Sequence, residues 1–230
     1  IDEGFDAVFI GMGLPKSVSI RDKNGDIDGL WNAMDFLSAA RKPGTLNLKG
    51  QTVAAIGGGN TAMDVATTAK RLGARDVYVI YRRSFKEMPA WSGERDRAIE
   101  EGVHFLILTQ PVGFNSTNGK LTGIKVCPTR LGEPDKSGRR RPETVESSAY
   151  VLDMDIAVEA IGQEPTEKIG EILPGIELTA GLIRTSEGTL ATSRPGVYAG
   201  GDLVRGASTV VAAVADGLAA ANEMNEFLRQ

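Results

Sequence analysis

Four short apolar runs that end in glycine constrain the fold of this chain most. The runs occupy residues 7–10, 53–56, 157–161 and 197–199, and they precede Gly11, Gly57, Gly162 and Gly200. A short, continuously apolar run that ends in glycine is typical of a strand buried on both faces that enters a tight turn. Because helical segments are predicted between some of these runs, the sequence indicates an α/β sheet protein.

Hydrophobic periodicity predicts where the helices lie. One clear helix covers residues 61–72 and stops before Gly73, and a second covers residues 209–228. Weaker helices are predicted at 31–41 and 93–101. We expect the apolar stripe from Val210 to Leu228 to pack in the core, with a ligand contact left open for its first turn.

Residues 111–161 differ in character from the rest of the chain. Three strands are predicted here, at 121–126, 149–152 and 155–161. A polar segment at 131–142 separates the first two strands, and we interpret it as a loop. Its three consecutive arginines, Arg139, Arg140 and Arg141, are expected at a solvated loop tip, and a docking patch is the alternative.

The run at 53–56 leads into the dinucleotide fingerprint G-x-G-x-x-G/A. The fingerprint is informative because it follows a predicted strand, opens a helix and leads to a second strand at 77–81. Its first position permits the tight turn, its second avoids a Cβ that would collide with a pyrophosphate, and its third lets helix and strand pack closely. The helix N-terminus then receives the phosphate. The candidate residues are Gly57, Gly59, Asn60, Thr61 and Ala62, and the alternative is a glycine turn that merely joins strand to helix.

The residues after the second strand indicate which nucleotide is bound. An NAD site usually has Asp or Glu at this place, whereas this chain has Arg82 and Arg83, with Lys86 close by. A guanidinium can bind a 2′-phosphate through two charge-assisted hydrogen bonds, and a carboxylate would repel it. We therefore predict NADP(H), and the alternative is that these arginines are ordinary surface charges at a strand end.

A second ligand signal lies near the C-terminus. Gly201 and Asp202 follow the short run at 197–199, and Ser208, Thr209 and Val210 then open the long helix. An Asp at the end of a strand can hydrogen-bond a polyol, and a helix N-terminus can stabilise negative charge on a ligand. An Asp that caps a loop explains the pattern equally well.

Composition excludes several classes of function. Lys and Arg number 26 against 30 Asp and Glu, which argues against nucleic acid as a partner. No run approaches the roughly 18 apolar residues of a membrane span, and we see no signal peptide, so we expect a cytoplasmic protein. One Cys and one His, Cys127 and His104, exclude an internal disulfide and make a protein-only metal site unfavourable. His104 is interpreted as structural; Glu87 and Glu164 are possible neighbours of a ligand, and no residue is assigned a catalytic role.

Several stretches, in a common order, resemble the NADPH-dependent flavin oxidoreductases of the glutamate synthase small-subunit type. The group includes the NADPH half of dihydropyrimidine dehydrogenase and relatives that act on ferredoxin. The matching stretches are 4–13, 56–64 (Ile-Gly-Gly-Gly-Asn-Thr-Ala-Met-Asp), 71–74, 81–90 (Tyr-Arg-Arg-Ser-Phe-Lys-Glu-Met-Pro-Ala), 131–135, 160–165 and 199–202 (Ala-Gly-Gly-Asp).

The resemblance implies a FAD-binding domain, residues 1–41 and 163–230, into which a Rossmann-like NADPH-binding domain, residues 42–162, is inserted. It implies that Asp202, next to Gly201, binds the ribityl or phosphate region of FAD, and that the helix start at Ser208, Thr209 and Val210 faces the flavin ring. It also places Gly11, Gly13 and Gly162 where the two domains meet.

Two features of such proteins are expected upstream of this chain. One is the first G-x-G-x-x-G βαβ unit, which binds the ADP half of FAD, and the other is the cysteine cluster that holds iron–sulfur clusters. We therefore expect a C-terminal portion that houses FAD only in part and passes hydride from NADPH to FAD and on to a partner redox centre, in a large or electron-accepting subunit. The main hypothesis is a glutamate synthase small subunit. The alternatives are a pyrimidine-reducing or ferredoxin-linked oxidoreductase, and a nucleotide-binding docking module without turnover of its own.

Overall fold

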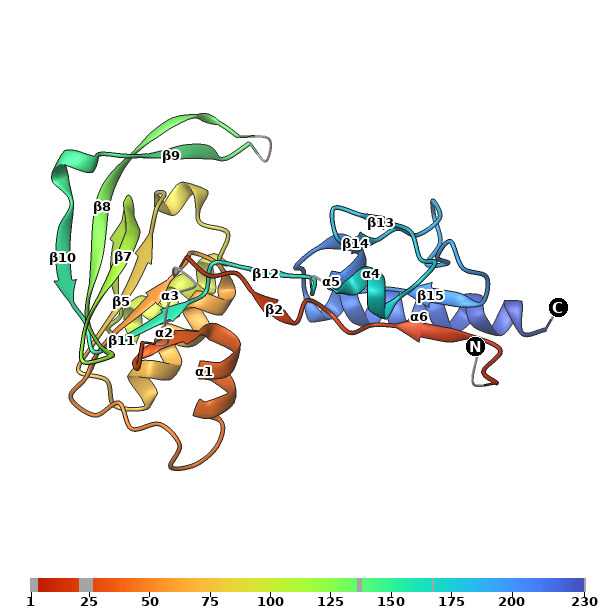
Figure 1. The fold of residues 1–230 in the computed structure, drawn as a ribbon, viewed down its shortest axis with the longest axis horizontal. Helices are drawn as coiled ribbons and strands as arrows, with labels where there is room; N and C mark the ends of the chain where they lie inside the picture. The colour runs from red at the N-terminus through yellow and green to blue at the C-terminus, as the bar shows by residue number, and fades with distance from the viewer. Residues whose placement is uncertain (1–3, 21–26, 136–137, 167, 230) are drawn as a thin grey trace. The chain divides into compact units, whose positions relative to one another are not determined.

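The computed structural model describes residues 4–20, 27–135, 138–166 and 168–229 (Figure 1). They form two compact units, which are described separately. Val18–Ile161 is called the central unit, and Ile1–Ser17 together with Gly162–Gln230 is called the flanking unit.

A parallel sheet forms the middle layer of the central unit. Within the described residues its strand order is β3-β11-β4-β5-β6, and every neighbouring pair is parallel. The strands are β3 (Leu30–Asn32), β4 (Thr52–Ile56), β5 (Asp76–Tyr81), β6 (His104–Ile107) and β11 (Ile156–Glu159). The runs predicted at 53–56, 77–81 and 155–161 therefore become neighbouring strands of one sheet.

Both faces of this sheet are buried, as the continuous apolar runs require. On β4, Val53 and Ala55 pack into a cluster with residues of the helices, whereas Ala54 and Ile56 pack into a second cluster with residues of a later strand, β8 (Lys120–Pro134). The helices lie on the first face: α1 (Ala33–Ala40), α2 (Asn60–Arg71) and α3 (Ser92–Glu100) (Figure 1). The four predicted helices correspond to these three and to α6 (Val210–Phe227), although residues 31–32 at the start of the first predicted helix belong to strand β3.

An antiparallel sheet covers the second face. Its strands are β7 (Thr109–Thr117), β8 (Lys120–Pro134), β9 (Arg140–Thr144) and β10 (Tyr150–Asp153), with β8 paired to each of the others. A short 3-10 turn, η2 (Glu146–Ser148), precedes β10. The C-terminal part of β8 pairs with β9 in a hairpin. We call this hairpin, residues 129–135 and 138–144, the β8–β9 arm.

The arm corrects the expectation of a loop at 131–142. Leu131 pairs with Pro142 and Pro134 with Arg140, because the chain on both sides of the turn is extended and supplies backbone partners. Arg140 thus belongs to a strand and not to a loop tip, and its guanidinium donates to the carbonyls of Leu131 and Gly132. Residues 136–137 of the predicted loop lie outside the described residues.

The flanking unit is built on a parallel pair of strands, β1 (Val8–Ile10) and β15 (Val197–Ala199). Ile10, Val197 and Leu203 are among the residues of its small core. The other strands are β2 (Lys16–Ser17), which pairs with β12 (Gln163–Glu164), and the hairpin β13 (Leu178–Thr179) and β14 (Leu182–Ile183). The helices are α4 (Ile169–Ile172), α5 (Asp202–Arg205) and α6 (Val210–Phe227).

The apolar stripe of α6 is exposed, which contradicts the expectation that it packs in the core. Val210 and Val211 are each 79% exposed, and Val214 and Leu218 are also exposed. Only Asp216 and Ala220 of this helix are buried. No described element of the flanking unit covers the stripe. The hydrophobic periodicity of the sequence thus predicted the helix correctly but did not predict which of its faces is buried.

The structure also moves the first predicted domain boundary. The two units divide at residues 17/18 and 161/162, whereas the expected divisions were 41/42 and 162/163. The reason is packing, since β3 pairs with β11 and Phe36 of α1 is fully buried in the helical face of the central unit. Residues 18–41 therefore belong to the central unit.

Candidate functional site

Three consecutive glycines lead from β4 into α2, and each meets different surroundings. Gly57 has φ +141°, and a Cβ there would lie 2.3 Å from the carbonyl oxygen of Ala160. A Cβ on Gly58 would lie 2.4 Å from the ring of Tyr81, but a Cβ on Gly59 would meet no atom within 4 Å. The fold itself therefore requires the first two glycines, whereas Gly59 borders open space.

The start of α2 is suited to an anion. Gly59 precedes the helix with an extended backbone and supplies no capping side chain. Its carbonyl accepts from Ala62 and Met63, but no described residue accepts a hydrogen bond from the amides of Asn60 and Thr61. Unpaired amides and the positive end of the helix dipole attract negative charge. Ala62 is fully buried, as expected for the position at which helix and strand pack closely.

Asn60 fixes a neighbouring segment beside this loop. Its side-chain Oδ1 accepts from the amide of Trp91 at 3.0 Å, and the amide of Ala90 donates to the carbonyl of Gly58 at 3.0 Å. The segment that follows β5 is thus tied to the glycine loop at two points.

The two arginines after β5 have different environments. The side chain of Arg83 is buried: its Nη2 lies 2.9 Å from Asp135 Oδ2, and its Nε donates to the carbonyl of Arg140 at 2.7 Å. Arg82 is exposed, and its guanidinium forms no hydrogen bond or ion pair with a described residue. Partial desolvation, followed by the charge of Arg83, lowers the pKa of Arg82, which still leaves it charged near neutral pH. Of the two, only Arg82 presents its charge to a ligand.

The predicted Lys86 is exposed on the 3-10 turn η1 (Phe85–Glu87). This turn is held by its own side chains, because the Ser84 hydroxyl donates to Glu87 Oε2 at 2.5 Å and thereby lowers the pKa of that carboxyl. The Tyr81 hydroxyl donates to the carbonyl of Glu87 at 2.8 Å. Glu87 therefore shapes the turn that carries Lys86.

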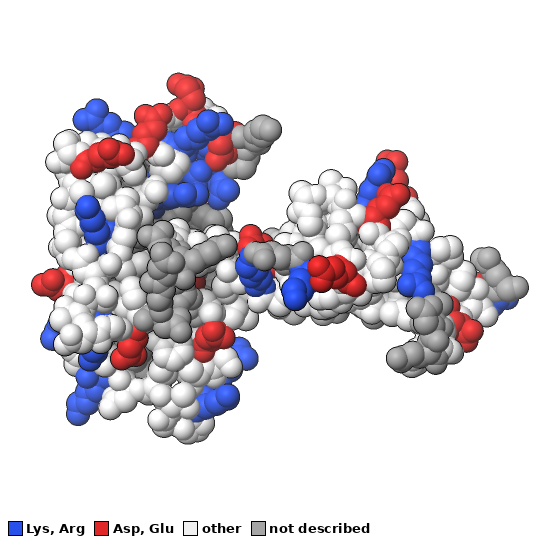
Figure 2. Space-filling model, in the orientation of Figure 1, with Lys and Arg blue, Asp and Glu red and all other residues white. Residues whose placement is uncertain are grey.

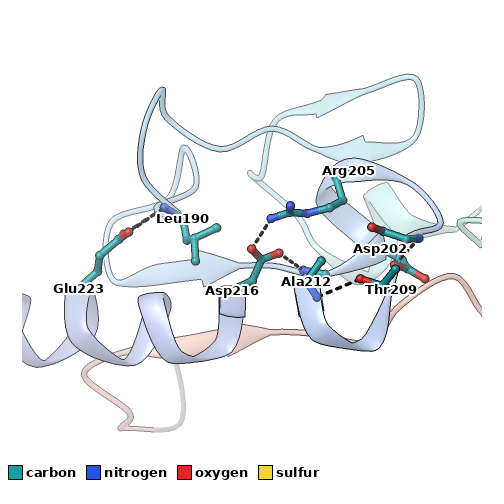
Figure 3. A network of polar contacts seen from close by, with 9 residues as sticks. Leu190, Asp202, Arg205, Thr209, Ala212, Asp216 and Glu223 are labelled. Atoms are coloured by element: carbon teal, nitrogen blue, oxygen red, sulfur yellow. Dashed lines mark hydrogen bonds and ion pairs between the residues drawn. The ribbon is translucent and has the colours of Figure 1, made fainter. Parts of the chain in front are cut away.

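A second glycine turn, in the flanking unit, is held by one buried carboxylate (Figure 3). Asp216 of α6 accepts the amide of Gly201 through Oδ2 at 2.7 Å and pairs with Arg205 through Oδ1. Gly201 has φ +71°, and a Cβ on Gly200 would lie only 2.7 Å from Cβ of Asp216. Gly200 is therefore required by the close approach of Asp216, and Gly201 by its positive φ.

Asp202 lies directly after this turn. Its Oδ1 accepts the amide of Ser208 at 3.0 Å, and Oδ2 makes no hydrogen bond with a described residue. Thr209 caps α6 by accepting the amide of Ala212 at 3.2 Å (Figure 3). One oxygen of Asp202 thus caps a loop, which was the alternative explanation, and the other oxygen is left for a ligand. The FAD role of Asp202, Ser208, Thr209 and Val210 stays a prediction.

Sequence reasoning missed Asp135, Thr129 and Asp216. Asp135 lies in the segment predicted as a loop and Thr129 lies just before it, and neither position indicates on sequence alone that it lies close to β5. Asp216 carried no such signal, because it lies off the apolar stripe of a helix that also holds Glu223 and Glu226, and a carboxylate at such a position is expected to face solvent. A buried carboxylate needs hydrogen-bond or ionic partners, and here the fold brings them to it.

The remaining candidates have structural environments. His104 lies on the outer strand β6, with its ring centroid 5.1 Å from that of Tyr78. Glu164 pairs with Lys16 at 2.9 Å, and Cys127 is buried. Within the described residues, no helix is long and apolar enough to cross a membrane, and no three His, Cys, Asp or Glu side chains gather as metal ligands.

A family model described as pyridine nucleotide-disulphide oxidoreductase matches residues 3–217 of this chain. The chain is 42% identical to the NADP(+)-dependent formate dehydrogenase subunit beta of Moorella thermoacetica, covering 100% of this chain and 33% of that protein. It is 38% identical to the glutamate synthase [NADPH] small chain of Escherichia coli, covering 97% of this chain and 51% of the relative. The chain thus spans a third to about half the length of these relatives.

Solved structures support the fold. FprA of Mycobacterium tuberculosis in complex with NADPH matches with a TM-score of 0.73 at 16% identity, over 99% of this chain and 64% of that one. Thioredoxin reductase of Lactococcus lactis matches with a TM-score of 0.71 at 21% identity, over 96% of this chain and 65% of that one. The predicted α/β fold class and the resemblance to glutamate synthase small chains are both confirmed.

The first two positions of the fingerprint, Gly57 and Gly59, make a matched test of what each glycine does. Gly57→Ala should lower the free energy of unfolding by about 2 kcal/mol or more, because it combines a positive φ with a backbone clash. Gly59→Ala should lower it by less than about 1 kcal/mol, because its φ is ordinary and the space is open. Urea denaturation measures both, and equal losses would contradict this division.

Asp216 should contribute strongly to the stability of the flanking unit. Asp216→Ala should lower the free energy of unfolding by about 1–3 kcal/mol, because the Gly201 amide loses its acceptor. Asp216→Asn should cost less, since an amide oxygen can still accept that hydrogen bond. Glu226→Ala, an exposed carboxylate on the same helix, is the control, and a loss for Asp216→Ala no larger than for this control would contradict the prediction.

Proposed function

This chain belongs to the pyridine nucleotide-disulphide oxidoreductase family, and from that premise we propose that its central unit binds NADPH and delivers hydride from it to FAD. The observation that carries the proposal is the pairing of an uncapped helix start, bordered by Gly59, with the exposed cation of Arg82 at the end of the neighbouring strand β5.

NADPH fits this arrangement at two points. The pyrophosphate would be bound by the amides of Asn60 and Thr61 at the start of α2, where Gly59 leaves room. The 2′-phosphate would be bound by Arg82, with Lys86 contributing charge, while Arg83 is already engaged by Asp135. The names of the relatives support the same nucleotide, since they specify NADP(+) or NADPH.

FAD would be bound by the flanking unit only in part. The free oxygen of Asp202 suits a polyol hydroxyl, and the start of α6 adds the positive end of a helix dipole. We propose that residues outside these 230 cover the exposed apolar face of α6 and bind the ADP half of FAD. Two observations support this: the exposure of Val210, Val211, Val214 and Leu218, and the shorter length of the chain relative to its relatives.

The chemistry of hydride transfer is supplied by the two cofactors, and the protein's part is to bind and orient them. No residue is assigned as a general base or nucleophile. What this chain must provide is an approach of donor and acceptor to about 3–3.5 Å, which depends on where it holds each cofactor.

The electron acceptor is proposed to be a partner redox centre, reached through iron–sulfur clusters outside this chain. The main proposal is a glutamate synthase small subunit, supported by relatives of that name at 34–40% identity. A second candidate, the beta subunit of an NADP-linked formate dehydrogenase, is supported by the 42% identity to the Moorella thermoacetica protein. The pyrimidine-reducing and ferredoxin-linked alternatives would use the same NADPH and FAD sites.

The nucleotide proposal is tested by titrating the chain with 2′,5′-ADP and with 5′-AMP in a calorimeter. We expect tighter binding of 2′,5′-ADP, and Arg82→Ala should reduce that preference about tenfold or more, because charge-assisted hydrogen bonds are lost. Arg184→Ala removes an exposed arginine from the flanking unit and serves as the control. Equal affinities for the two ligands, or an unchanged preference in Arg82→Ala, would refute the proposal.

The flavin proposal is tested by NADPH oxidation with an artificial electron acceptor. The purified chain should carry far less than one FAD per molecule by absorbance, and added FAD should produce turnover. Asp202→Ala should then raise the FAD concentration needed for half-maximal rate. Flavin retained near one per chain would contradict partial housing of FAD, and absence of turnover at saturating FAD would favour the docking-module alternative.

A further inference from the structure

The β8–β9 arm makes hydrogen bonds with both residues that follow β5: with the backbone carbonyl of Arg82 and with the side chain of Arg83. The Thr129 hydroxyl donates to the carbonyl of Arg82 at 2.8 Å, and the Arg83 guanidinium binds Asp135 at 2.9 Å and the carbonyl of Arg140 at 2.7 Å. The arm is therefore attached both to the backbone that carries Arg82 and to the side chain beside it.

Arg83 is well placed to position the arm and poorly placed to bind a ligand. It is only 6% exposed, and its Nε and Nη2 both donate to the arm. A buried guanidinium deprived of such partners is strongly destabilising, so the pairing with Asp135 has to be kept in the folded protein. These two contacts therefore hold Asp135 and Arg140 of the arm close to the end of β5.

This attachment brings another arginine towards Arg82. The amide of Asp135 donates to the carbonyl of Arg139 at 2.7 Å, and Arg139 directly precedes Arg140, whose carbonyl contacts Arg83. The side chain of Arg139 is exposed, like that of Arg82. The positive charge of Arg139 contributes to the lowered pKa of Arg82, which indicates that the two charges lie within electrostatic reach.

The three arginines of the arm are not equivalent. Arg140 uses its guanidinium within the hairpin, where it donates to the carbonyls of Leu131 and Gly132. Arg139 directly precedes β9, and its carbonyl accepts the amide of Asp135. Arg141 is the second residue of β9. Lys and Arg side chains are gathered around this part of the central unit, interspersed with acidic ones (Figure 2).

We propose that the β8–β9 arm completes the 2′-phosphate site, with Arg139 joining Arg82 as a phosphate ligand and the Arg83–Asp135 ion pair as the positioning element. The inference rests on the proposed NADPH site and assigns the residues that set its preference for a 2′-phosphorylated nucleotide. Two guanidinium groups from separate segments of the chain can bind a phosphate dianion from two sides, whereas one exposed arginine alone gives a weak contact in water.

The test measures the ratio of the dissociation constants for 5′-AMP and 2′,5′-ADP, called here the phosphate preference, by calorimetry on the chain. Arg139→Ala should reduce the preference about tenfold, as expected for loss of a charge-assisted contact. Arg141→Ala is the matched control, because it removes the same charge from the same arm, and it should change the preference less than about twofold.

Asp135→Asn separates positioning from simple electrostatics. Removing a negative charge close to a phosphate would by itself strengthen phosphate binding, so a purely electrostatic effect raises the preference. If Asp135 positions the arm, the same substitution lowers the preference. Adding Arg139→Ala to Asp135→Asn should then cause little further loss, because both changes remove one contact.

The outcomes distinguish this inference from the function on which it rests. If Arg139→Ala behaves like Arg141→Ala, or if Asp135→Asn raises the preference, the arm is not part of the site although Arg82 can still be. If the unaltered chain shows no preference, or Arg82→Ala does not change it, the NADPH proposal itself fails. If Arg139→Ala and Asp135→Asn lower the preference and Arg141→Ala does not, the arm completes the site.

Discussion

The central unit depends on the close approach of β4 to β11 where both strands end. Gly57 allows it, since any Cβ there would meet the carbonyl oxygen of Ala160 at 2.3 Å. Glu159 and Ile56, the last residues of the two strands, are in register, so this contact aligns the carboxyl edge of the sheet. The glycine loop and the start of α2 follow from that edge, and ligands of open α/β sheets bind there. The fingerprint thus has a packing role before it has a binding role.

Local signals made much of this fold predictable. The fingerprint, the helix after it and the apolar strands depend on neighbouring residues, and the structure contains them close to the expected positions. The errors concern features decided by distant partners. The arm was read as a loop because its polar residues become strand only by pairing with each other, as Leu131 does with Pro142. The boundary at 41/42 failed because Phe36 is buried by contacts that its own segment does not reveal.

The arginines show the same limit for the site. Arg82 and Arg83 are adjacent and chemically identical, yet one is exposed and the other is committed to Asp135. The dipeptide alone therefore does not indicate which of the two arginines is exposed and which is buried. That choice is made by the arm, some fifty residues later in the sequence. A chain with net charge −4 can still concentrate cations locally by this means.

Different contacts hold the two glycine turns, and the difference concerns which unit can bind a ligand with its own residues. The turn of the flanking unit is held by contacts within the protein. Asp216 accepts a hydrogen bond from the Gly201 amide and forms an ion pair with Arg205, and Gly200 packs against Cβ of Asp216. The loop of the central unit instead leaves the amides of Asn60 and Thr61 without acceptors. Preordered groups reduce the entropy cost of binding, which is consistent with the ligand sites proposed at both turns. The surroundings of the two turns differ. The turn of the central unit borders a buried sheet, whereas the turn of the flanking unit lies next to α6, whose apolar face is uncovered. This contrast supports the proposal that the central unit binds a nucleotide with its own residues, whereas α6 of the flanking unit is covered by residues outside this chain.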